Sequence, residues 1–330
     1  MNFQQLRAVR EAARNGYNLT EVAQVLYTSQ PGVSRQIREL EDELGVDIFI
    51  RAGKRLTGLT PPGEAILPIV DRLLLESENL RRAGADFHAS RSGQLSIAAT
   101  HSQARYALPL VVRDFREQFP DVALHLHQGS PRQVAEMLLS GAADIGVATE
   151  ALTGYASLAT LPGYRWTHSV VVPQGHPLLE QAAAGRELTL QSLVRFPIIT
   201  YEQGYTGRAH IDESFATAGL TPNVVLTAMD ADVIKTYVEL GMGIGIVASI
   251  AFDAERDRSL HALDAGHLFK VNTTRIALRK GVWLRAYALQ FIESFVPTLT
   301  KDVVQAAVSV NNSDGEGAEA ELASVARKAA

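Results

Sequence analysis

The sequence predicts an α/β protein with three parts: an N-terminal, mainly helical winged helix-turn-helix, a linker helix, and a body of two subdomains. Three observations predict this fold class. Two short helices with capping residues lie near the N-terminus, a long amphipathic helix follows, and strands alternate with helices from residue 95 to about residue 299. Such alternation is typical of doubly wound α/β domains.

Composition limits the classes of protein to consider. The 330 residues suffice for two or three domains, and the mix of 46% hydrophobic and 20% charged residues is ordinary for a globular chain. No apolar run reaches the roughly 18 residues of a membrane span. The N-terminus has no signal-peptide core, so we expect a cytoplasmic location and no membrane partner.

Cysteine and charge narrow the chemistry further. The chain has no cysteine, which excludes disulfides, thiol nucleophiles and cysteine-ligated metals. The formal net charge is −5, so any contact with nucleic acid must come from the local distribution of charge.

The segment 28–45, TSQPGVSRQIRELEDELG, predicts an amphipathic helix. Its apolar residues recur at helical spacing: Val33, Ile37, Leu40 and Leu44. Ser29 can cap its start, Pro31 suits the first turn, and Gly45 suits the position just past the end.

Two helices precede this segment. Residues 2–14 show helical periodicity, and Asn18 with Glu21 has capping-box spacing at the start of a second helix that ends near Tyr27. The second helix and segment 28–45, joined by a short turn, form a helix-turn-helix. In this motif the second helix enters the major groove of DNA.

Basic residues support contact with DNA. Arg35 and Arg38 lie early in the segment, whereas its acidic residues lie late. Residues 48–51 and 54–57 then predict two short strands that form a wing, suited to phosphate contacts. The alternative for the wing alone is a solvated basic loop. We expect these residues to bind DNA: Thr28, Ser29, Gln30, Pro31, Ser34, Arg35, Arg38, Arg51, Lys54 and Arg55.

Residues 60–87 predict a linker helix. Thr60 and Pro61 suit its start, and an apolar stripe that begins at Ile66 favours pairing with a partner helix. The alternative is packing against the same chain. Pro68 should kink the helix or shorten its regular part. Segment 83–94, rich in small and polar residues, is expected to be a hinge.

The body should hold a ligand at the carboxyl ends of its strands. Thr100, Ser102 and Gln103 follow the strand 95–99, and Thr149 follows the strand 144–148. Glu202 follows a third strand at 196–200, with Tyr201 before it and Thr206 and Arg208 nearby. Each hydroxyl alone could simply cap a helix. Together they predict a cleft site for an anion or carboxylate.

Other chemistry is not supported. The nine histidines show no metal-binding spacing, and no nucleophile elbow, phosphate loop or metalloprotease motif occurs. The sequence therefore predicts neither an enzyme nor a protein-bound cofactor or metal. Residues 301–330 are expected to form a partly disordered tail without an assigned role.

The segment SQPGVSRQIRELEDELG resembles the N-terminal domain of LysR-type transcriptional regulators, and the resemblance extends to about residue 300. Within it, the segments THSQARYALP, HQGSPRQVAEML, VATEAL and DADVIKTYVELGMGIGIVAS resemble the CysB group, regulators of sulfur assimilation. The resemblance implies a periplasmic-binding-protein-like effector domain whose chain crosses between subdomains near residues 162–166 and 265–270. The domains expected are 1–59, 60–87 and 88–300, the last with subdomains 94–162 plus 268–300 and 163–267.

The resemblance also implies effector contacts. Thr100, Ser102, Gln103 and Thr149 match ligand-contacting positions, and Tyr164 and Trp166 match residues that line the cleft. Ser102 stands where threonine is typical, which keeps the hydroxyl. Glu202 also stands where threonine is typical, and its carboxylate would repel sulfate but favour an ammonium-bearing effector such as O-acetylserine.

The expected function is activation of genes for sulfate uptake and cysteine synthesis, with O-acetylserine, N-acetylserine, sulfate or thiosulfate as the small-molecule effector. The expected partners are double-stranded DNA promoter sites, RNA polymerase and further copies of the chain in a dimer of dimers. Two alternatives stay open. One is a LysR-type regulator that responds to a different small carboxylate, and the other is a cytosolic solute-binding module.

Overall fold

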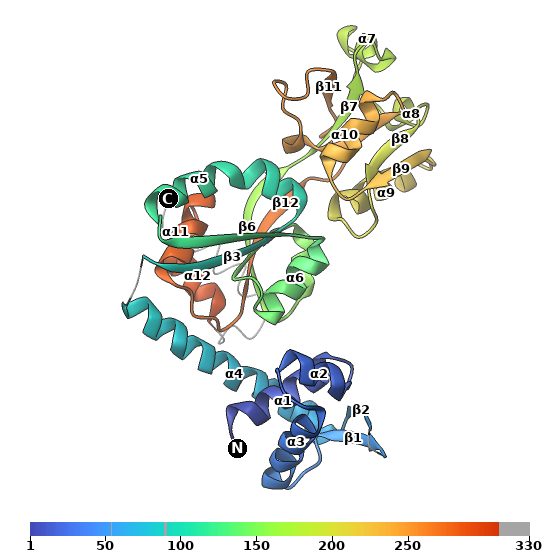
Figure 1. Cartoon of the computed structure of the whole chain (residues 1–330). Helices are drawn as coiled ribbons and strands as arrows, with labels where there is room; N and C mark the ends of the chain where they lie inside the picture. Colours follow the sequence, from blue (N-terminus) through green and yellow to red (C-terminus); the bar gives the residue numbers. More distant parts are fainter. Residues whose placement is uncertain (54, 89–90, 310–330) are drawn as a thin grey trace. The chain divides into compact units, whose positions relative to one another are not determined.

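The computed structural model describes residues 1–53, 55–88 and 91–309. They form two compact units, the first made of residues 1–87 and the second beginning at His88 (Figure 1). None of the described helices is long and apolar enough to cross a membrane.

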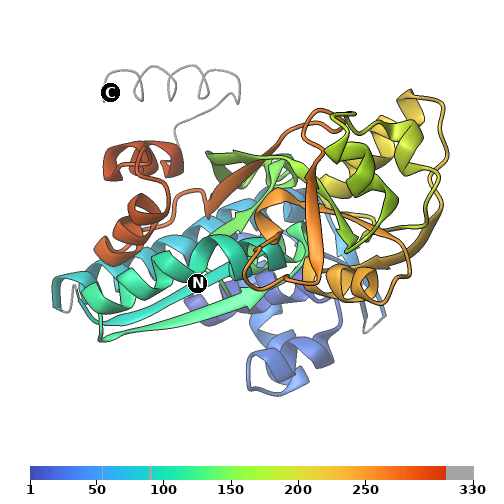
Figure 2. The same ribbon diagram turned by 90° about the horizontal axis from the view of Figure 1, so that it is seen from above.

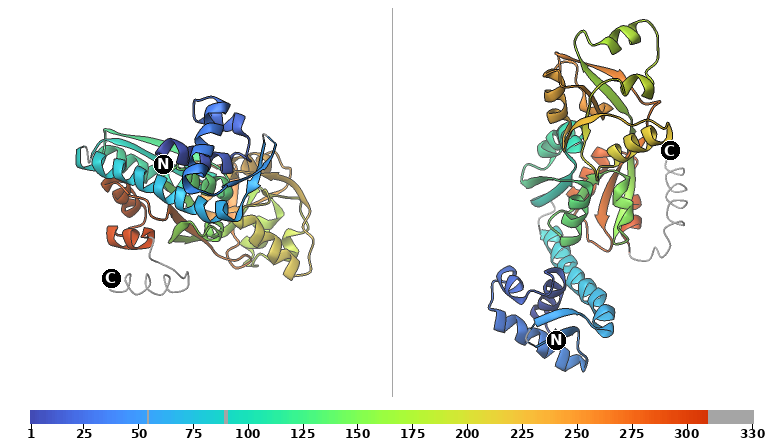
Figure 3. Two further views of the ribbon diagram at one scale, coloured as in Figure 1. Left: turned by 90° about the horizontal axis from the view of Figure 1, so that it is seen from below. Right: turned by 90° about the vertical axis from the view of Figure 1, so that its right-hand side faces the viewer.

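The first unit is a winged helix-turn-helix followed by one long helix. Its elements are α1 (Phe3–Arg14), α2 (Leu19–Val25), α3 (Gln30–Leu44), β1 (Phe49–Ala52), β2 (Arg55–Leu59) and α4 (Pro61–His88). Strands β1 and β2 pair antiparallel and form the wing. The long helix α4 is drawn in cyan in Figure 3.

Capping residues fix the ends of α3 as the sequence predicts. The Ser29 hydroxyl accepts a hydrogen bond from the Gly32 backbone N–H at 3.3 Å. Gly45 adopts a left-handed backbone with φ of 70°, which glycine reaches without the cost of a Cβ clash. The apolar stripe is shorter than predicted, because Val33, Ile37 and Leu40 are buried but Leu44 is exposed.

The first part of α4 belongs to the winged-helix core. Val70 and Leu74 are buried in the same cluster as α1 and α3. Gly63 lies so close to the Ile48 carbonyl that a Cβ atom would come within 2.1 Å of its oxygen. Pro68 does not end the helix, which continues to His88. The predicted hinge at 83–94 is wrong for its first part, since residues 83–88 are helical.

The first sheet of the second unit has the strand order β4-β3-β5-β12-β6. Helices α5, α11 and α12 pack on one face and α6 on the other. The strands are β3 (Gly93–Ala99), β4 (Val122–Gln128), β5 (Ile145–Ala148), β6 (Leu158–Trp166) and β12 (Asn272–Arg279). The helices are η1 (Gln103–Ala107), α5 (Leu108–Gln118), α6 (Pro131–Ser140), η2 (Glu150–Gly154), α11 (Ala286–Phe295) and α12 (Lys301–Val308).

The second sheet has the order β11-β7-β10-β8-β9, with α10 on one face and α7, α8 and α9 on the other (Figure 2). The strands are β7 (His168–Pro173), β8 (Ile198–Tyr201), β9 (Val224–Ala228), β10 (Ile244–Ala248) and β11 (Leu260–Asp264). The helices are α7 (Pro177–Ala183), α8 (Leu190–Leu193), α9 (Thr206–Thr217), α10 (Ala231–Glu239) and η3 (Ser249–Ala251).

Two chain crossings join the sheets. The first runs from β6 to β7 through Thr167, and the second from β11 to β12 through residues 265–271. Strands β3, β4 and β5 run parallel, so the chain segments after Ala99 and Ala148 meet at one edge. The predicted α/β class with two subdomains is confirmed.

The C-terminal boundary of the body differs from the prediction. Residues 301–308, expected to begin a tail, form α12, whose Val303, Val304 and Val308 are buried against the first sheet. The remainder of the predicted tail, residues 310–330, lies outside the described residues.

Glu41 joins α3 to the wing. Its side chain is buried, and its Oε1 atom accepts hydrogen bonds from the backbone N–H groups of Ile48 (2.9 Å) and Phe49 (3.1 Å). Its other oxygen pairs with Arg51. One carboxylate therefore satisfies two buried donors and one cation.

We predict that Glu41→Ala lowers the free energy of unfolding of the first unit by about 3 kcal/mol, because two buried N–H groups and Arg51 lose their acceptor. Asp42→Ala, at the exposed neighbouring position, should change it by less than about 0.5 kcal/mol. Both tryptophans, Trp166 and Trp283, lie in the second unit. Urea unfolding followed by circular dichroism and by tryptophan fluorescence therefore separates the units. Equal effects of the two variants would contradict the prediction.

Candidate functional site

The first candidate surface is the polar side of α3. Val33 and Ile37 face the core, whereas the predicted DNA-binding residues of this helix lie at the surface. The exposed ones are Thr28, Ser29, Gln30, Pro31, Arg35 and Arg38, and Ser34 is half-buried. The Arg35 Nε atom donates to Glu39 at 2.7 Å, and this hydrogen bond lowers the pKa of Glu39.

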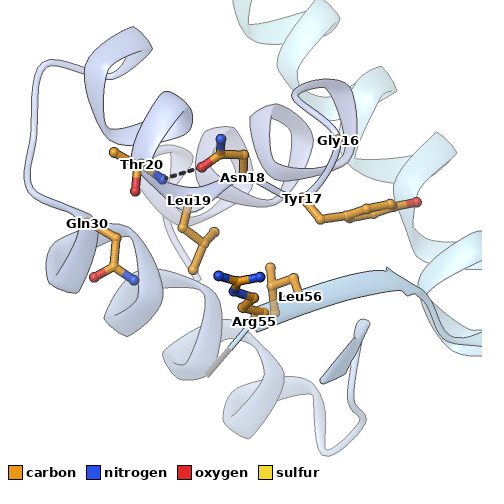
Figure 4. A pocket seen from close by; sticks show the side chains of 8 residues that line it. All are labelled: Gly16, Tyr17, Asn18, Leu19, Thr20, Gln30, Arg55 and Leu56. Carbon is orange, nitrogen blue, oxygen red and sulfur yellow. Dashed lines mark hydrogen bonds between the residues drawn. The ribbon is translucent and has the colours of Figure 1, made fainter. Parts of the chain in front are cut away.

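The wing residues differ in availability. Arg55 is exposed at the start of β2, beside a hollow of about 480 Å³ between the wing and helices α2 and α3. Figure 4 shows Arg55, Gln30 and Thr20 around this hollow. Arg51 was predicted to contact phosphate, but it is half-buried and paired with Glu41. Lys54 lies outside the described residues.

Two tyrosines of the first unit have a left-handed backbone, Tyr17 with φ of 65° and Tyr27 with φ of 51°. This region is strained for a residue with a large side chain. Tyr17 offsets the strain by packing edge-on against Phe49, with 6.1 Å between ring centroids. Tyr27, directly before Thr28, is 97% exposed. Sequence reasoning did not single out Tyr27, because its exposure depends on the turn geometry.

The second candidate site is a cavity between the two sheets, within the second unit. The space within it that is open to the centres of water-sized molecules is about 30 Å³. It is lined by Thr100, His101, Ser102, Gln103, Pro131, Thr149, Trp166, Tyr201, Tyr205, Thr206, Gly207 and Met229. Five of the predicted effector-binding residues therefore lie together.

A hydrogen bond between the two subdomains spans this cavity, and another within the first subdomain supports it. Thr149, after β5, and Thr206, at the start of α9, place their hydroxyl oxygens 2.5 Å apart. The Tyr164 hydroxyl donates to the Gln103 Oε1 atom at 2.6 Å, which fixes the amide of a side chain that is 1% exposed. Tyr164 thus supports the cavity through Gln103 and does not line it.

Glu202 differs in position from the predicted residues that line the cavity. Its side chain is exposed and is not among the lining residues. It follows the buried Tyr201 at the end of β8, and burial together with the charge of Glu202 raises the pKa of Tyr205, which lines the cavity. The expected preference for an ammonium-bearing effector stays a prediction.

Arg208 also differs from the expectation that it could balance a nearby charge. It is buried, its Nη1 atom donates to the Tyr201 carbonyl at 2.8 Å, and its Nε atom donates to Asp212 at 2.7 Å. These partners hold the guanidinium at the base of α9. No formal charge of Arg208 is presented to the cavity, since it is not one of the lining residues.

Several lining residues were missed by sequence reasoning. Pro131 and Met229 follow the ends of β4 and β9, so the strand-end rule could have found them. Tyr205 and Gly207 flank Thr206 at the start of α9 and had no such signal.

A three-residue group that sequence spacing does not reveal lies close to the cavity. His101, Asp230 and Asp232 place potential ligand atoms within 4.8 Å of one another. Asp232 is already paired with Arg105 and Lys235, so its charge is neutralised by protein cations.

Trp166 lines the cavity, and His168 packs against Trp166. His168 is fully buried, its ring lies 5.4 Å from that of Trp166, and neither of its nitrogens has a hydrogen-bond partner among the described residues. A Cβ atom on Gly207 would come within 3.0 Å of His168 Nε2, so a larger residue there would require the imidazole to shift. Burial, together with repulsion from His210, lowers the pKa of His168 to about 4.

A winged helix-turn-helix followed by a two-sheet body with a cavity is the architecture of a DNA-binding transcriptional regulator. Residues 3–64 match the family model described as bacterial regulatory helix-turn-helix protein, lysR family, and residues 88–299 match the LysR substrate binding domain. The chain therefore belongs to the LysR family of transcriptional regulators and is not an enzyme.

The similar proteins place it within that family. It is 61% identical over 302 residues to the HTH-type transcriptional regulator SsuR of Burkholderia cenocepacia, which covers 91% of this chain and 96% of the relative. It is 52% identical over 308 residues to the regulator CysB of the same species, covering 93% and 97%. A crystal structure of the cofactor-binding domain of the Cbl transcriptional regulator is 46% identical, with a TM-score of 0.62, and covers 66% of this chain and 93% of that one. The predicted resemblance to the CysB group is confirmed.

We predict that His168 makes the second unit less stable in acid. Its pKa is about 4 when folded and about 6.5 when unfolded, so the unfolded state binds more protons between these values. The stabilisation is fully present above pH 6.5 and is lost as pH falls toward 4, by about 3 kcal/mol in total.

Urea unfolding between pH 7 and pH 4, followed by tryptophan fluorescence, measures this dependence. His168→Phe removes the titrating group and should give a shallower decline than the parent chain. An identical pH dependence in both proteins would show that His168 is not the group responsible.

Proposed function

We propose that this chain binds double-stranded promoter DNA through the polar side of α3 and the wing. Arg35, Arg38, Gln30 and Ser34 are the proposed groove contacts, with Arg55 at the phosphate backbone. The observation that carries this proposal is the exposure of these side chains on a helix whose opposite side is buried. Basic side chains on an exposed recognition helix suit contacts with bases and phosphates.

One helix-turn-helix covers one half-site, so we propose a dimer of dimers with half-sites about 34 Å apart or at multiples of that distance. The exposed apolar residues Ile69, Leu73 and Leu80 of α4 suit pairing with a partner helix. RNA polymerase is a proposed partner because activation requires it, and the cytoplasm is the proposed location because the DNA is there.

We predict that Arg35→Ala weakens binding to the specific site about tenfold, since a guanidinium that contacts DNA contributes to affinity. The slope of the logarithm of the binding constant against the logarithm of salt concentration should also become shallower by about one, because one fewer cation is released. Fluorescence anisotropy with the full-length chain and a promoter fragment, at several salt concentrations, measures both effects.

The second unit offers a matched control. Arg132 on α6 is also 81% exposed and makes the same type of contact, with its Nε atom 2.8 Å from Glu136. Arg132→Ala should leave DNA affinity unchanged. If the two variants bind alike, the α3 surface is not the DNA-binding face.

We also propose that the cavity binds the effector that controls transcription, and that the controlled genes serve sulfate uptake and cysteine synthesis. The identity to CysB and SsuR over more than nine-tenths of the chain supports the sulfur role. The lining hydroxyls of Thr100, Ser102 and Thr149 suit oxygen acceptors, which acetylserines and sulfur oxyanions both provide. Glu202 is not one of the lining residues, so an oxyanion in the cavity would not contact its carboxylate.

We predict that isothermal titration calorimetry with the full-length chain detects binding of at least one of O-acetylserine, N-acetylserine, sulfate and thiosulfate. Ser102→Ala and Thr149→Val should each weaken that binding about fivefold to tenfold, the worth of one lost hydrogen bond. Glu202→Gln, outside the cavity, should leave it unchanged. Absence of binding for all four would remove the sulfur effector from the proposal, while the DNA-binding proposal would stand.

A further inference from the structure

A network of charged and aromatic side chains joins the two subdomains beside the cavity. The Tyr106 hydroxyl, on η1, donates to Asp232 Oδ1 on α10 at 2.7 Å and accepts from Lys235 Nζ at 3.0 Å. Arg105, the preceding residue, pairs with Asp232. Lys235 Nζ also lies 5.2 Å from the centre of the Tyr106 ring. We call Arg105, Tyr106, Asp232 and Lys235 the latch.

The α10 side of the latch retains its partners without η1. Lys235 is 5% exposed, and its ammonium donates to both carboxylate oxygens of Asp257 at 2.8 Å. Asp257 and Asp232 belong to the same subdomain as Lys235. Separation of the subdomains therefore breaks hydrogen bonds and the ion pair between Arg105 and Asp232. Because Lys235 keeps Asp257 as its partner, separation does not leave a buried charge unpaired, which would be strongly destabilising. The latch can open and close.

The protonation states agree with this geometry. Burial alone would raise the pKa of Asp232, but the Tyr106 hydrogen bond and the charges of Lys235 and Arg105 lower it below its usual value. Burial opposes the charge on Lys235, yet the hydrogen bonds to Asp257 and Tyr106 raise its pKa. Asp232 and Lys235 are thus both charged at neutral pH.

The latch is covalently continuous with the cavity wall. Element η1 is a π-helix of five residues, which begins at Gln103 in the cavity and ends just past Tyr106. Single π-turns are uncommon and occur often at functional sites. Here the wider turn carries Gln103 on the cavity side and Arg105 and Tyr106 on the α10 side. Any movement of the latch changes the position of the cavity wall.

The size of the cavity shows what the closed latch permits. The space open to the centres of water-sized molecules is about 30 Å³, so an acetylated amino acid, with ten heavy atoms, needs more added room than a compact oxyanion, with about half as many. A larger ligand must separate the subdomains and break the latch, whereas a smaller one needs less separation.

We propose that Tyr106 and Asp232 are specificity-determining residues, which hold the cleft narrow and so disfavour larger effectors relative to compact oxyanions. The effector part of this proposal rests on the proposed function of the cavity. Loss of the latch should widen the cleft in the effector-free protein and shift relative affinity toward the larger ligand.

The chain has no cysteine, so two introduced cysteines are the only sites at which a thiol-reactive spin label attaches. Glu136→Cys on α6 and Ala216→Cys on α9 are exposed positions, one in each subdomain. Double electron–electron resonance on the full-length chain without effector then reports the subdomain separation. Tyr106→Phe, which keeps the ring but deletes the hydroxyl, should shift the distance distribution to longer values, and Asp232→Asn should shift it in the same direction.

Tyr237→Phe is the matched control, because it deletes a tyrosine hydroxyl on α10 outside the latch and should leave the distribution unchanged. Calorimetry with sulfate and with O-acetylserine gives the second measurement. The ratio of the Kd for O-acetylserine to the Kd for sulfate should fall about tenfold in Tyr106→Phe, the worth of about one hydrogen bond.

A distance distribution that is unchanged in both Tyr106→Phe and Asp232→Asn would overturn the latch. A longer distance with an unchanged ratio of Kd values would overturn its role in specificity. If neither ligand binds the parent chain, the proposed effector fails and the specificity role falls with it. The distance measurement then still decides whether the latch closes the cleft.

Discussion

The two chain crossings between the sheets are the constraint on which the effector-binding half of the molecule depends. The chain passes between subdomains twice, at Thr167 and through residues 265–271. The second sheet is built entirely from the strands between these crossings, β7 to β11, whereas the first sheet is completed only when the chain returns as β12. The cavity forms where the strand ends of the two sheets face each other. Trp166, which lines the cavity, directly precedes Thr167, so a change in the crossing is also a change in the cavity.

The cavity surface is mostly apolar, and two of its polar side chains already have partners in the protein. Thr149 bonds Thr206 across the cleft, and Gln103 is held by Tyr164. A ligand that enters must therefore replace hydrogen bonds that already exist, and its gain is the difference between the new bonds and the old ones. Selectivity in such a site comes from shape and from the number of acceptors presented, more than from net charge.

Local rules made much of this molecule predictable. Capping residues such as Ser29 and Gly45 mark helix ends by backbone chemistry that acts within a few residues. The alternation of strands and helices identified the α/β body, and the strand-end rule placed Thr100, Ser102, Gln103 and Thr149 in one cavity. These signals depend on neighbours in sequence, which is why they could be read without a structure.

The errors share a different physical origin. Arg51 is paired with Glu41 because a carboxylate ten residues earlier is buried, and Glu202 follows β8 without lining the cavity. Helix α12 was missed although Val303, Val304, Ala307 and Val308 have helical spacing, since its stability comes from the sheet that it covers. Each depends on contacts between distant segments or on side-chain direction, which periodicity does not encode.

Gly63 allows the start of α4 to be held rigidly against the wing. With no side chain between this helix and Ile48, and with Val70 and Leu74 in the shared core, the first part of α4 and the wing form one rigid piece. The 14 residues that follow Leu74, up to His88, then extend about 21 Å beyond that anchorage. The helix acts as a lever arm, and a tilt of about 10° at the winged helix displaces its far end by nearly 4 Å over this length.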